Sequence, residues 1–288
     1  MRKITKIPLI FQLIIMIMAR RETKSMKAII LSAGQGKRLM PLTADRPKCI
    51  LPIMGQTLIE WQIDELAKCG IDQVTVVVGY RADKVEEILC SRYDRNRVRT
   101  VYNEAYAVSD NLVSCWTVHN EMDEEFILLN GDNLFEAAVL QRFLETNDHS
   151  VTVVVNQKSS YDADDMKVEL EGCRLVKIGK DLLLSQVQGE SIGMIMFRDQ
   201  GPILFRDALE KALHDPASQK KYYLSVIDDL ARKFPVWTCL INDLQWCEVD
   251  YKADIEQAQK VVSVCRTSRK ADFEDDPCQL TGASPANP

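Results

Sequence analysis

The chain has 288 residues, 46% of them hydrophobic, which is enough apolar material for one large globular domain. Its net charge of -6 and a pI near 5.3 exclude a broad nucleic-acid surface but leave room for a local phosphate pocket. Nine cysteines lie at irregular spacings without a C-x-x-C pair. They predict reduced thiols in the cytoplasm, and zinc is not expected because no histidine lies at ligand spacing from a cysteine.

Residues 1–25 differ from the rest of the chain. A basic start is followed by an apolar run over residues 7–19 and then by Arg20-Arg21. The run is shorter than the ~20 residues of a transmembrane helix, and a signal-peptide cleavage site is missing. Three interpretations stay open: translation starts at Met26, residues 7–19 form an interfacial anchor, or the segment is a secretory signal. Membrane contact is expected only through residues 7–19.

From Met26 onward, apolar runs typical of strands alternate with helical spacing. In chain order the pattern predicts a strand at 27–31, a helix at 57–69, a strand at 73–78, a helix at 83–92, a strand at 98–102, a helix at 111–122, and strands at 125–129 and 151–155. This order predicts an α/β fold of Rossmann-like type, with a mixed, mainly parallel sheet flanked by helices. Ligands of such sheets bind beyond the carboxyl ends of the strands.

The second half is less regular. Strands are predicted at 167–170, 175–178, 191–197 and 236–241, and helices at 202–213, 222–233 and 253–264. The chain after Arg266 is polar and without periodicity, so we expect it to be disordered. The predicted organisation is a leader at 1–25, one domain at 26–265 and a tail at 266–288.

The clearest chemical signal is a glycine-rich turn after the first strand. It reads Leu31-Ser32-Ala33-Gly34-Gln35-Gly36-Lys37-Arg38, and Pro41-Leu42-Thr43 and Pro47-Lys48 follow. Glycines let backbone N–H groups converge on phosphate oxygens. Arg38 and Lys48 add cations that stabilise charge at a reacting phosphorus. The P-loop pattern is absent, and Leu39 stands where a dinucleotide-binding motif has its third glycine.

Two acidic segments predict a magnesium site. Asp132 follows the strand at 125–129, at the sheet edge where ligands bind, and Mg²⁺ prefers carboxylates together with phosphate oxygens. Glu248 and Asp250 alternate along an extended segment, so both face one side. Two acids on one face are costly without a cation between them. The simpler interpretation, a turn aspartate and surface carboxylates, stays open at this point.

Residues 27–66 resemble the amino-terminal signature of nucleotidyltransferases that act on sugar 1-phosphates and phosphoalcohols: A-G-x-G-x-R, P-L-T, P-K and a hydrophobic helix. Residues 246–250 are similar to the family's W-x-E-[IV]-D. The resemblance runs to about Val264 and implies the nucleotide-diphospho-sugar transferase fold and Mg²⁺-dependent attack of an acceptor phosphate on a nucleoside triphosphate. Arg38 is then expected to contact the leaving pyrophosphate, and Lys48 to bridge the reacting groups. The phosphates are expected to be cradled by Gly34, Gln35 and Gly36, and Leu31 and Ala33 are expected to belong to the same nucleotide site.

Other segments indicate which branch of the family the chain resembles. The E-K-P segment of sugar enzymes is absent, while residues 189–194 resemble the G-E-x-[IV]-G-[IM] of cytidylyltransferases for phosphocholine and aminoalkyl phosphonates. The N-x-x-Y-A…N-x-x-S pattern of these enzymes matches residues 103–114. It implies that Asn111 and Ser114 lie near the nucleobase, with Gly79 at the base edge. Lys167 and Lys180 are candidates for the acceptor phosphate, and Glu190 is a candidate for an acceptor cation. Further candidates for the cation are Tyr161, Asp164 and Trp246.

The expected function is that of a CTP-dependent cytidylyltransferase that makes a CDP-alcohol or CMP-phosphonate and uses Mg²⁺. Its expected partners are the triphosphate and a small phosphorylated acceptor, without nucleic acid, and a homo-oligomer stays open. Three alternatives remain: a sugar-1-phosphate uridylyl- or thymidylyltransferase, an inactive nucleotide-binding regulatory module, and an NAD-dependent oxidoreductase.

Overall fold

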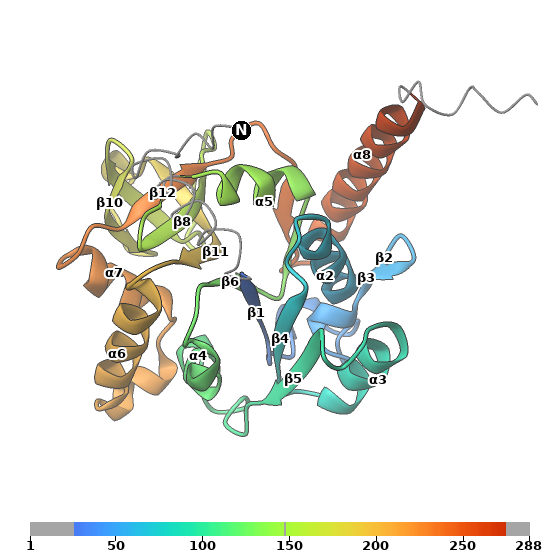
Figure 1. The fold of residues 1–288 in the computed structure, drawn as a ribbon, viewed down its shortest axis with the longest axis horizontal. Helices are drawn as coiled ribbons and strands as arrows, with labels where there is room; N and C mark the ends of the chain where they lie inside the picture. The colour runs from blue at the N-terminus through green and yellow to red at the C-terminus, as the bar shows by residue number, and fades with distance from the viewer. Residues whose placement is uncertain (1–25, 147, 275–288) are drawn as a thin grey trace, which may run out of the picture.

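A computed structural model describes residues 26–146 and 148–274, and it contains the predicted α/β sheet (Figure 1). Nine strands follow the order β5-β4-β1-β6-β11-β8-β12-β10-β9. The four strands at one end of the sheet are parallel: β1 (Lys27–Ser32), β4 (Gln73–Val78), β5 (Val98–Tyr102) and β6 (Phe126–Asn130). Strands β1, β4 and β6 are covered on both faces, which explains why they read as almost continuous apolar runs.

The other half of the sheet is mostly antiparallel. Its strands are β8 (Val151–Asn156), β9 (Lys167–Glu171), β10 (Arg174–Gly179), β11 (Gly189–Phe197) and β12 (Trp237–Leu240). Strand β11 runs antiparallel to β6 and β8, and only the β8–β12 pair is parallel. The Rossmann-like mixed sheet is confirmed, but its mainly parallel character holds only for the amino-terminal half.

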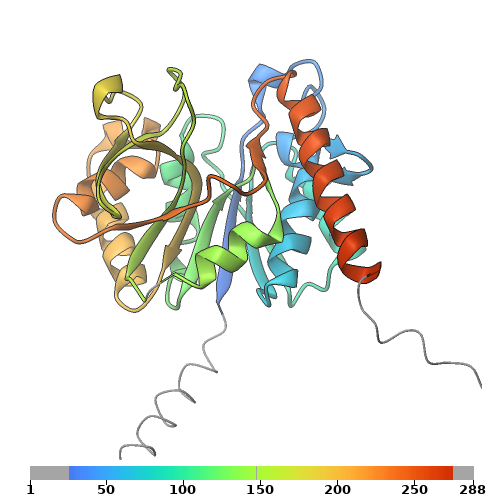
Figure 2. The same cartoon turned by 90° about the horizontal axis from the view of Figure 1, so that it is seen from above.

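Helices cover both faces of the sheet (Figures 1 and 2). One apolar cluster joins the sheet to α4 (Asn111–Thr117), α6 (Gly201–Leu213) and α7 (Leu224–Ala231). The opposite cluster joins it to α2 (Leu58–Lys68), α3 (Ala82–Arg92) and α5 (Ala137–Leu144). Successive side chains of β1 point to opposite faces of the sheet and so contribute to both clusters. Ile29 and Leu31 pack in the first cluster, and Ala28 and Ile30 pack in the second.

Two short antiparallel strand pairs and the last helix form a third apolar cluster beside the sheet. The pairs are β2 (Pro52–Ile53) with β3 (Gln56–Thr57), and β7 (Asn133–Phe135) with β13 (Trp246–Glu248). Helix α8 (Asp254–Glu274), red in Figure 2, buries Ala258, Val261 and Val262 in this cluster. The β7–β13 pair brings the carboxyl-terminal acidic segment next to the end of β6.

Some element boundaries differ from prediction. Helix α8 continues to Glu274, so the expected disorder after Arg266 is wrong for residues 267–274; no glycine or proline interrupts the segment. Helix α4 ends at Thr117, and a 3₁₀ turn replaces its predicted last turn. Helix α5, only eight residues long, was not predicted. Short 3₁₀ turns are formed by Lys37–Leu39, Lys48–Ile50, His119–Glu121, Leu184–Gln186 and Pro216–Lys220.

The leader at 1–25 and the tail at 275–288 lie outside the described residues. Within residues 26–146 and 148–274, no helix has both the length and the apolar character needed to cross a bilayer.

Candidate active site

The predicted site segments meet at the carboxyl ends of β1 and β6. The two strands pair in register, and the N–H of Gly131 donates to Leu31 O at 2.9 Å. The acidic segment arrives beside them, since Val249 N donates to Asp132 O at 3.1 Å. A pocket of about 490 Å³ lies at this edge. Arg38, Asp132 and Asp250 line it, although they come from three distant parts of the sequence.

The glycine-rich turn has the backbone geometry that its sequence predicts. Gly36 has φ 76°, a left-handed conformation that favours glycine. A Cβ at this position would also lie 2.8 Å from the Cβ of Lys48. Thr43 Oγ1 donates to Gly36 O at 2.8 Å and fixes the turn. At Gly34, by contrast, an added Cβ would meet no atom within 4 Å, so the turn is open to a ligand there.

Lys48 lies between two of the predicted metal ligands. Its Nζ donates to Asp132 Oδ2 at 2.7 Å and to Asp250 Oδ1 at 2.5 Å. Burial opposes the charge of the ammonium, but the two carboxylates outweigh this effect and raise the pKa of Lys48 above its ordinary value. Arg38 reaches the same cluster, because its NH1 donates to Asp250 Oδ2 at 3.0 Å. Both predicted phosphate-binding cations therefore contact predicted metal ligands.

The three predicted carboxylates form a cluster that suits a hard cation. Asp132, Glu248 and Asp250 each offer an oxygen within 4.8 Å of the others. Asp132 Oδ1 is buried and has no hydrogen-bond partner in the described structure, so it retains a lone pair for a ligand. Mg²⁺ prefers such oxygen donors, and the residues fit this ion.

Glu248 responds to its place in the cluster. Desolvation by the surrounding protein and the negative charges of Asp132 and Asp250 raise the pKa of Glu248 to about 8. Its side chain faces the open pocket and is reached by solvent. We therefore regard repulsion between the carboxylates as the more important cause. A cation bound among the three groups would remove this repulsion.

The residues predicted near the base have different environments. Asn111 lines the pocket, and its Oδ1 accepts from the N–H of Tyr223 at 2.8 Å. Ser114 is buried beneath it and does not line the pocket; its Oγ accepts from Asn103 Nδ2 at 3.0 Å. Ser114 therefore joins α4 to Asn103, just after β5, while Asn111 lies at the pocket wall.

Gly79 permits a close approach of two strand ends. A Cβ there would lie 2.7 Å from Ala33 O, and the next residue, Tyr80, donates its N–H to the same oxygen at 2.9 Å. Ala33 and Leu31 are buried, so their side chains support the turn from below. The close packing explains why a glycine occupies position 79. Its expected place at the edge of the nucleobase remains a prediction.

On the acceptor side of the pocket, Glu190 is nearly buried and lines the wall. Lys158 Nζ lies 2.7 Å from Glu190 and 2.8 Å from Asp165, so one ammonium pairs with two carboxylates. Burial raises the pKa of Glu190. Lys167 is also buried, but it does not line the pocket, and its Nζ donates to Lys180 O at 2.9 Å.

Sequence reasoning missed Lys158 and Tyr251 as pocket residues. Lys158 follows β8, where the same rule that identified Asp132 applies, because polar residues just beyond a strand end face the ligand edge. Tyr251 follows Asp250 directly and places its ring beneath Arg38, with the guanidinium carbon 5.3 Å from the ring centre. The sequence motif ended one residue too early to include it.

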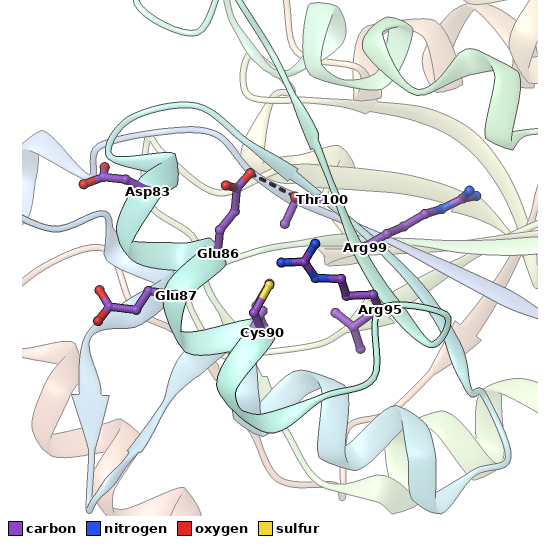
Figure 3. Close-up of a pocket in the computed structure, with 9 residues that line it drawn as sticks. Asp83, Glu86, Glu87, Cys90, Arg95, Arg99 and Thr100 are labelled. Atoms are coloured by element: carbon purple, nitrogen blue, oxygen red, sulfur yellow. Dashed lines mark hydrogen bonds between the residues drawn. The ribbon is translucent and has the colours of Figure 1, made fainter.

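A second cavity, of about 530 Å³, lies between α3 and β5 at the edge of the sheet (Figure 3). Glu86 of α3 points toward Thr100, whose Oγ1 donates to it at 3.0 Å, whereas the carboxylates of Asp83 and Glu87 point away from Arg95. None of the predicted site residues lines it, so the predicted chemistry belongs to the pocket at the strand ends.

Comparison with known proteins agrees with this geometry. Residues 27–163 match the family model described as nucleotidyl transferase. The chain is 26% identical over 256 residues to CTP:phosphoglutamine cytidylyltransferase of Campylobacter jejuni, which covers 80% of this chain and 98% of the relative. It is 27% identical over 243 residues to CMP-5'-(3-aminopropyl)phosphonate synthase of Streptomyces rubellomurinus, which covers 81% of this chain but 38% of the relative.

Solved structures show the same fold. The CTP:phosphocholine cytidylyltransferase of Streptococcus pneumoniae superposes with a TM-score of 0.67 at 21% identity, covering 83% of this chain and 99% of the other. The inositol-1-phosphate CTP transferase of T. maritima gives a TM-score of 0.69 at 22% identity, covering 84% of this chain and 97% of the other. The nucleotide-diphospho-sugar transferase type of fold is thereby confirmed.

Proposed function

We propose that this chain, whose residues 27–163 match the nucleotidyl transferase family model, transfers a cytidylyl group from CTP to a small phosphorylated acceptor, with Mg²⁺ as its cofactor. The observation that carries the proposal is the meeting of Lys48, Asp132 and Asp250 beside the glycine-rich turn. A protein that only binds nucleotide has no need of this combination of cations and carboxylates.

In the proposed reaction, a phosphate or phosphonate oxygen of the acceptor attacks the α-phosphorus of CTP. A new P–O–P bond forms, the α–β phosphoanhydride bond breaks, and pyrophosphate leaves with the bonding electrons. The turn from Gly34 to Gly36, which is open at Gly34, holds phosphate oxygens by backbone N–H groups. Arg38 binds the pyrophosphate, and Lys48, which is held by Asp132 and Asp250 of the pocket wall, stabilises the charge at the α-phosphate.

The metal ligands in this proposal are Asp132, Asp250 and Glu248. Bound there, Mg²⁺ supplies Lewis-acid neutralisation of the phosphate charge. The unpartnered Oδ1 of Asp132 supports this assignment, since a buried carboxylate oxygen without a donor is costly.

The proposed identity of the nucleotide and the proposed class of acceptor are based on sequence relatives. Both sequence relatives reported above carry CTP or CMP in their names, which also mention phosphoglutamine and an aminopropylphosphonate. The chain also matches, at 35% identity over 114 residues, a UTP–glucose-1-phosphate uridylyltransferase of Haloferax volcanii, which keeps the sugar alternative as an outcome of the test.

The test is a matrix of CTP, UTP, dTTP and ATP against phosphocholine, 2-aminoethylphosphonate and glucose 1-phosphate. Pyrophosphate release is measured with and without Mg²⁺. We expect turnover with CTP and an amino-bearing acceptor, and loss of turnover with EDTA. Faster turnover with UTP or dTTP and glucose 1-phosphate would replace the proposal by the sugar-nucleotide function. Nucleotide binding without turnover on any acceptor would favour the regulatory module.

A further inference from the structure

One carboxylate at the mouth of the pocket joins three separate segments. Asp164, in the loop between β8 and β9, accepts at Oδ1 from Arg38 NH2 at 3.2 Å and from Lys180 Nζ at 3.3 Å. Its Oδ2 accepts from Tyr251 Oη at 2.9 Å. The hydrogen bonds from Tyr251 and Lys180 lower the pKa of Asp164, so the group is charged at neutral pH. The acceptor-side loop is thereby tied to the residue assigned to pyrophosphate.

The donors of Arg38 are divided between two carboxylates. NH1 is used by Asp250 and NH2 by Asp164, and the guanidinium face lies against the Tyr251 ring. A bidentate phosphate contact needs two parallel donors of the same guanidinium. A phosphate group that binds through the same N–H groups of NH1 and NH2 therefore displaces at least one of these carboxylates.

The contact with Asp164 is the one that breaks more easily. The side chains of Arg38 and Asp164 are 45% and 42% exposed, whereas Asp250 is 26% exposed. Exposed ion pairs are weak because water and salt screen them. Asp164 also keeps the donors of Lys180 and Tyr251 after Arg38 leaves, so no unpaired charge remains behind. Release at this contact costs less than release from Asp250.

We propose that Asp164 is a positioning residue that holds Arg38 away from the triphosphate until nucleotide binds and displaces it. This inference rests on the proposed function, because it uses the assignment of Arg38 to the pyrophosphate. It predicts that Asp164 competes with nucleotide for Arg38. The opposite role, in which Asp164 pre-orients Arg38 for phosphate, predicts weaker nucleotide binding when the carboxylate is removed.

The test is nucleotide affinity of the full chain, measured by calorimetry with CTP and Mg²⁺ and no acceptor. For Asp164→Asn we expect about threefold to fivefold tighter binding, the range set by an exposed ion pair. With the acceptor at saturation, the steady-state KM for CTP should fall by a similar factor. Asp164→Glu keeps the charge and should restore an affinity close to that of the native protein.

Asp181→Asn is the matched control. It removes the same negative charge from an exposed side chain. Asp181 is next to Lys180 in the chain, but Asp181 itself does not line the pocket. An equal gain of affinity in this control would overturn the proposal, since general repulsion would then explain it. Weaker or unchanged CTP binding by Asp164→Asn would also overturn it. If the native chain binds no nucleotide at all, the proposed function itself fails, and that outcome is distinct from the other two.

Discussion

Lys48 occupies the position between the carboxylates that the proposed function gives to Mg²⁺. Its Nζ lies 2.7 Å from Asp132 and 2.5 Å from Asp250, while its side chain is 15% exposed. In the metal-free protein the ammonium therefore acts as an internal competitor of the ion. We predict that Lys48→Met binds Mg²⁺ more tightly than the native protein, although it loses catalytic activity.

The size of the effect follows from the geometry. A pair of unit charges 4 Å apart contributes about 4 kcal/mol at an effective dielectric constant of ~20. Only part of this appears in the affinity, because Lys48 can turn toward solvent when Mg²⁺ arrives and because the carboxylates gain water when the lysine is absent. We expect a gain of about tenfold, equal to about 1.4 kcal/mol.

The assay is calorimetric titration of Mg²⁺ into nucleotide-free protein, with thermal unfolding as a second readout. Lys37→Met serves as the control, because Lys37 is an exposed lysine of the same turn that does not line the main pocket. It should leave the affinity within twofold. Unchanged or weaker Mg²⁺ binding by Lys48→Met would refute the competition between the ammonium and the ion.

Three further predictions concern single residues of the site. Asp132→Asn should abolish pyrophosphate release and leave the circular dichroism spectrum unchanged, because the residue serves a ligand at the pocket; full activity would contradict its role. Gly36→Ala should lower the free energy of unfolding by ~1–3 kcal/mol in urea titrations, owing to the left-handed φ and the contact with Lys48. Gly34→Ala is its control and should change stability by less than ~0.5 kcal/mol, so equal losses would show the reasoning wrong. Glu190→Gln should raise the KM of an amino-bearing acceptor severalfold and spare that of CTP, whereas an effect confined to CTP would remove Glu190 from the acceptor side.

The sequence alone determined the parts of the protein that depend on local patterns. The apolar run of β1 and the glycines after it predict a strand followed by an open turn. Asp132 was identified because a polar residue just beyond a buried strand faces the ligand edge of a parallel sheet. Glu248 and Asp250 were assigned to one face by the two-residue period of an extended chain, and the three carboxylates do cluster.

The tertiary structure decided which side chains meet, because those partners are far apart in the chain. The pairing of β1 with β6 and of β7 with β13 brings Lys48 to carboxylates 84 and 202 positions away. The sequence around each lysine does not show which one reaches the pocket. Lys167 donates its ammonium to backbone oxygen, whereas Lys158 lines the pocket. Local periodicity fixes the direction of each side chain along its own strand, but only the order of strands in the sheet fixes what that side chain contacts.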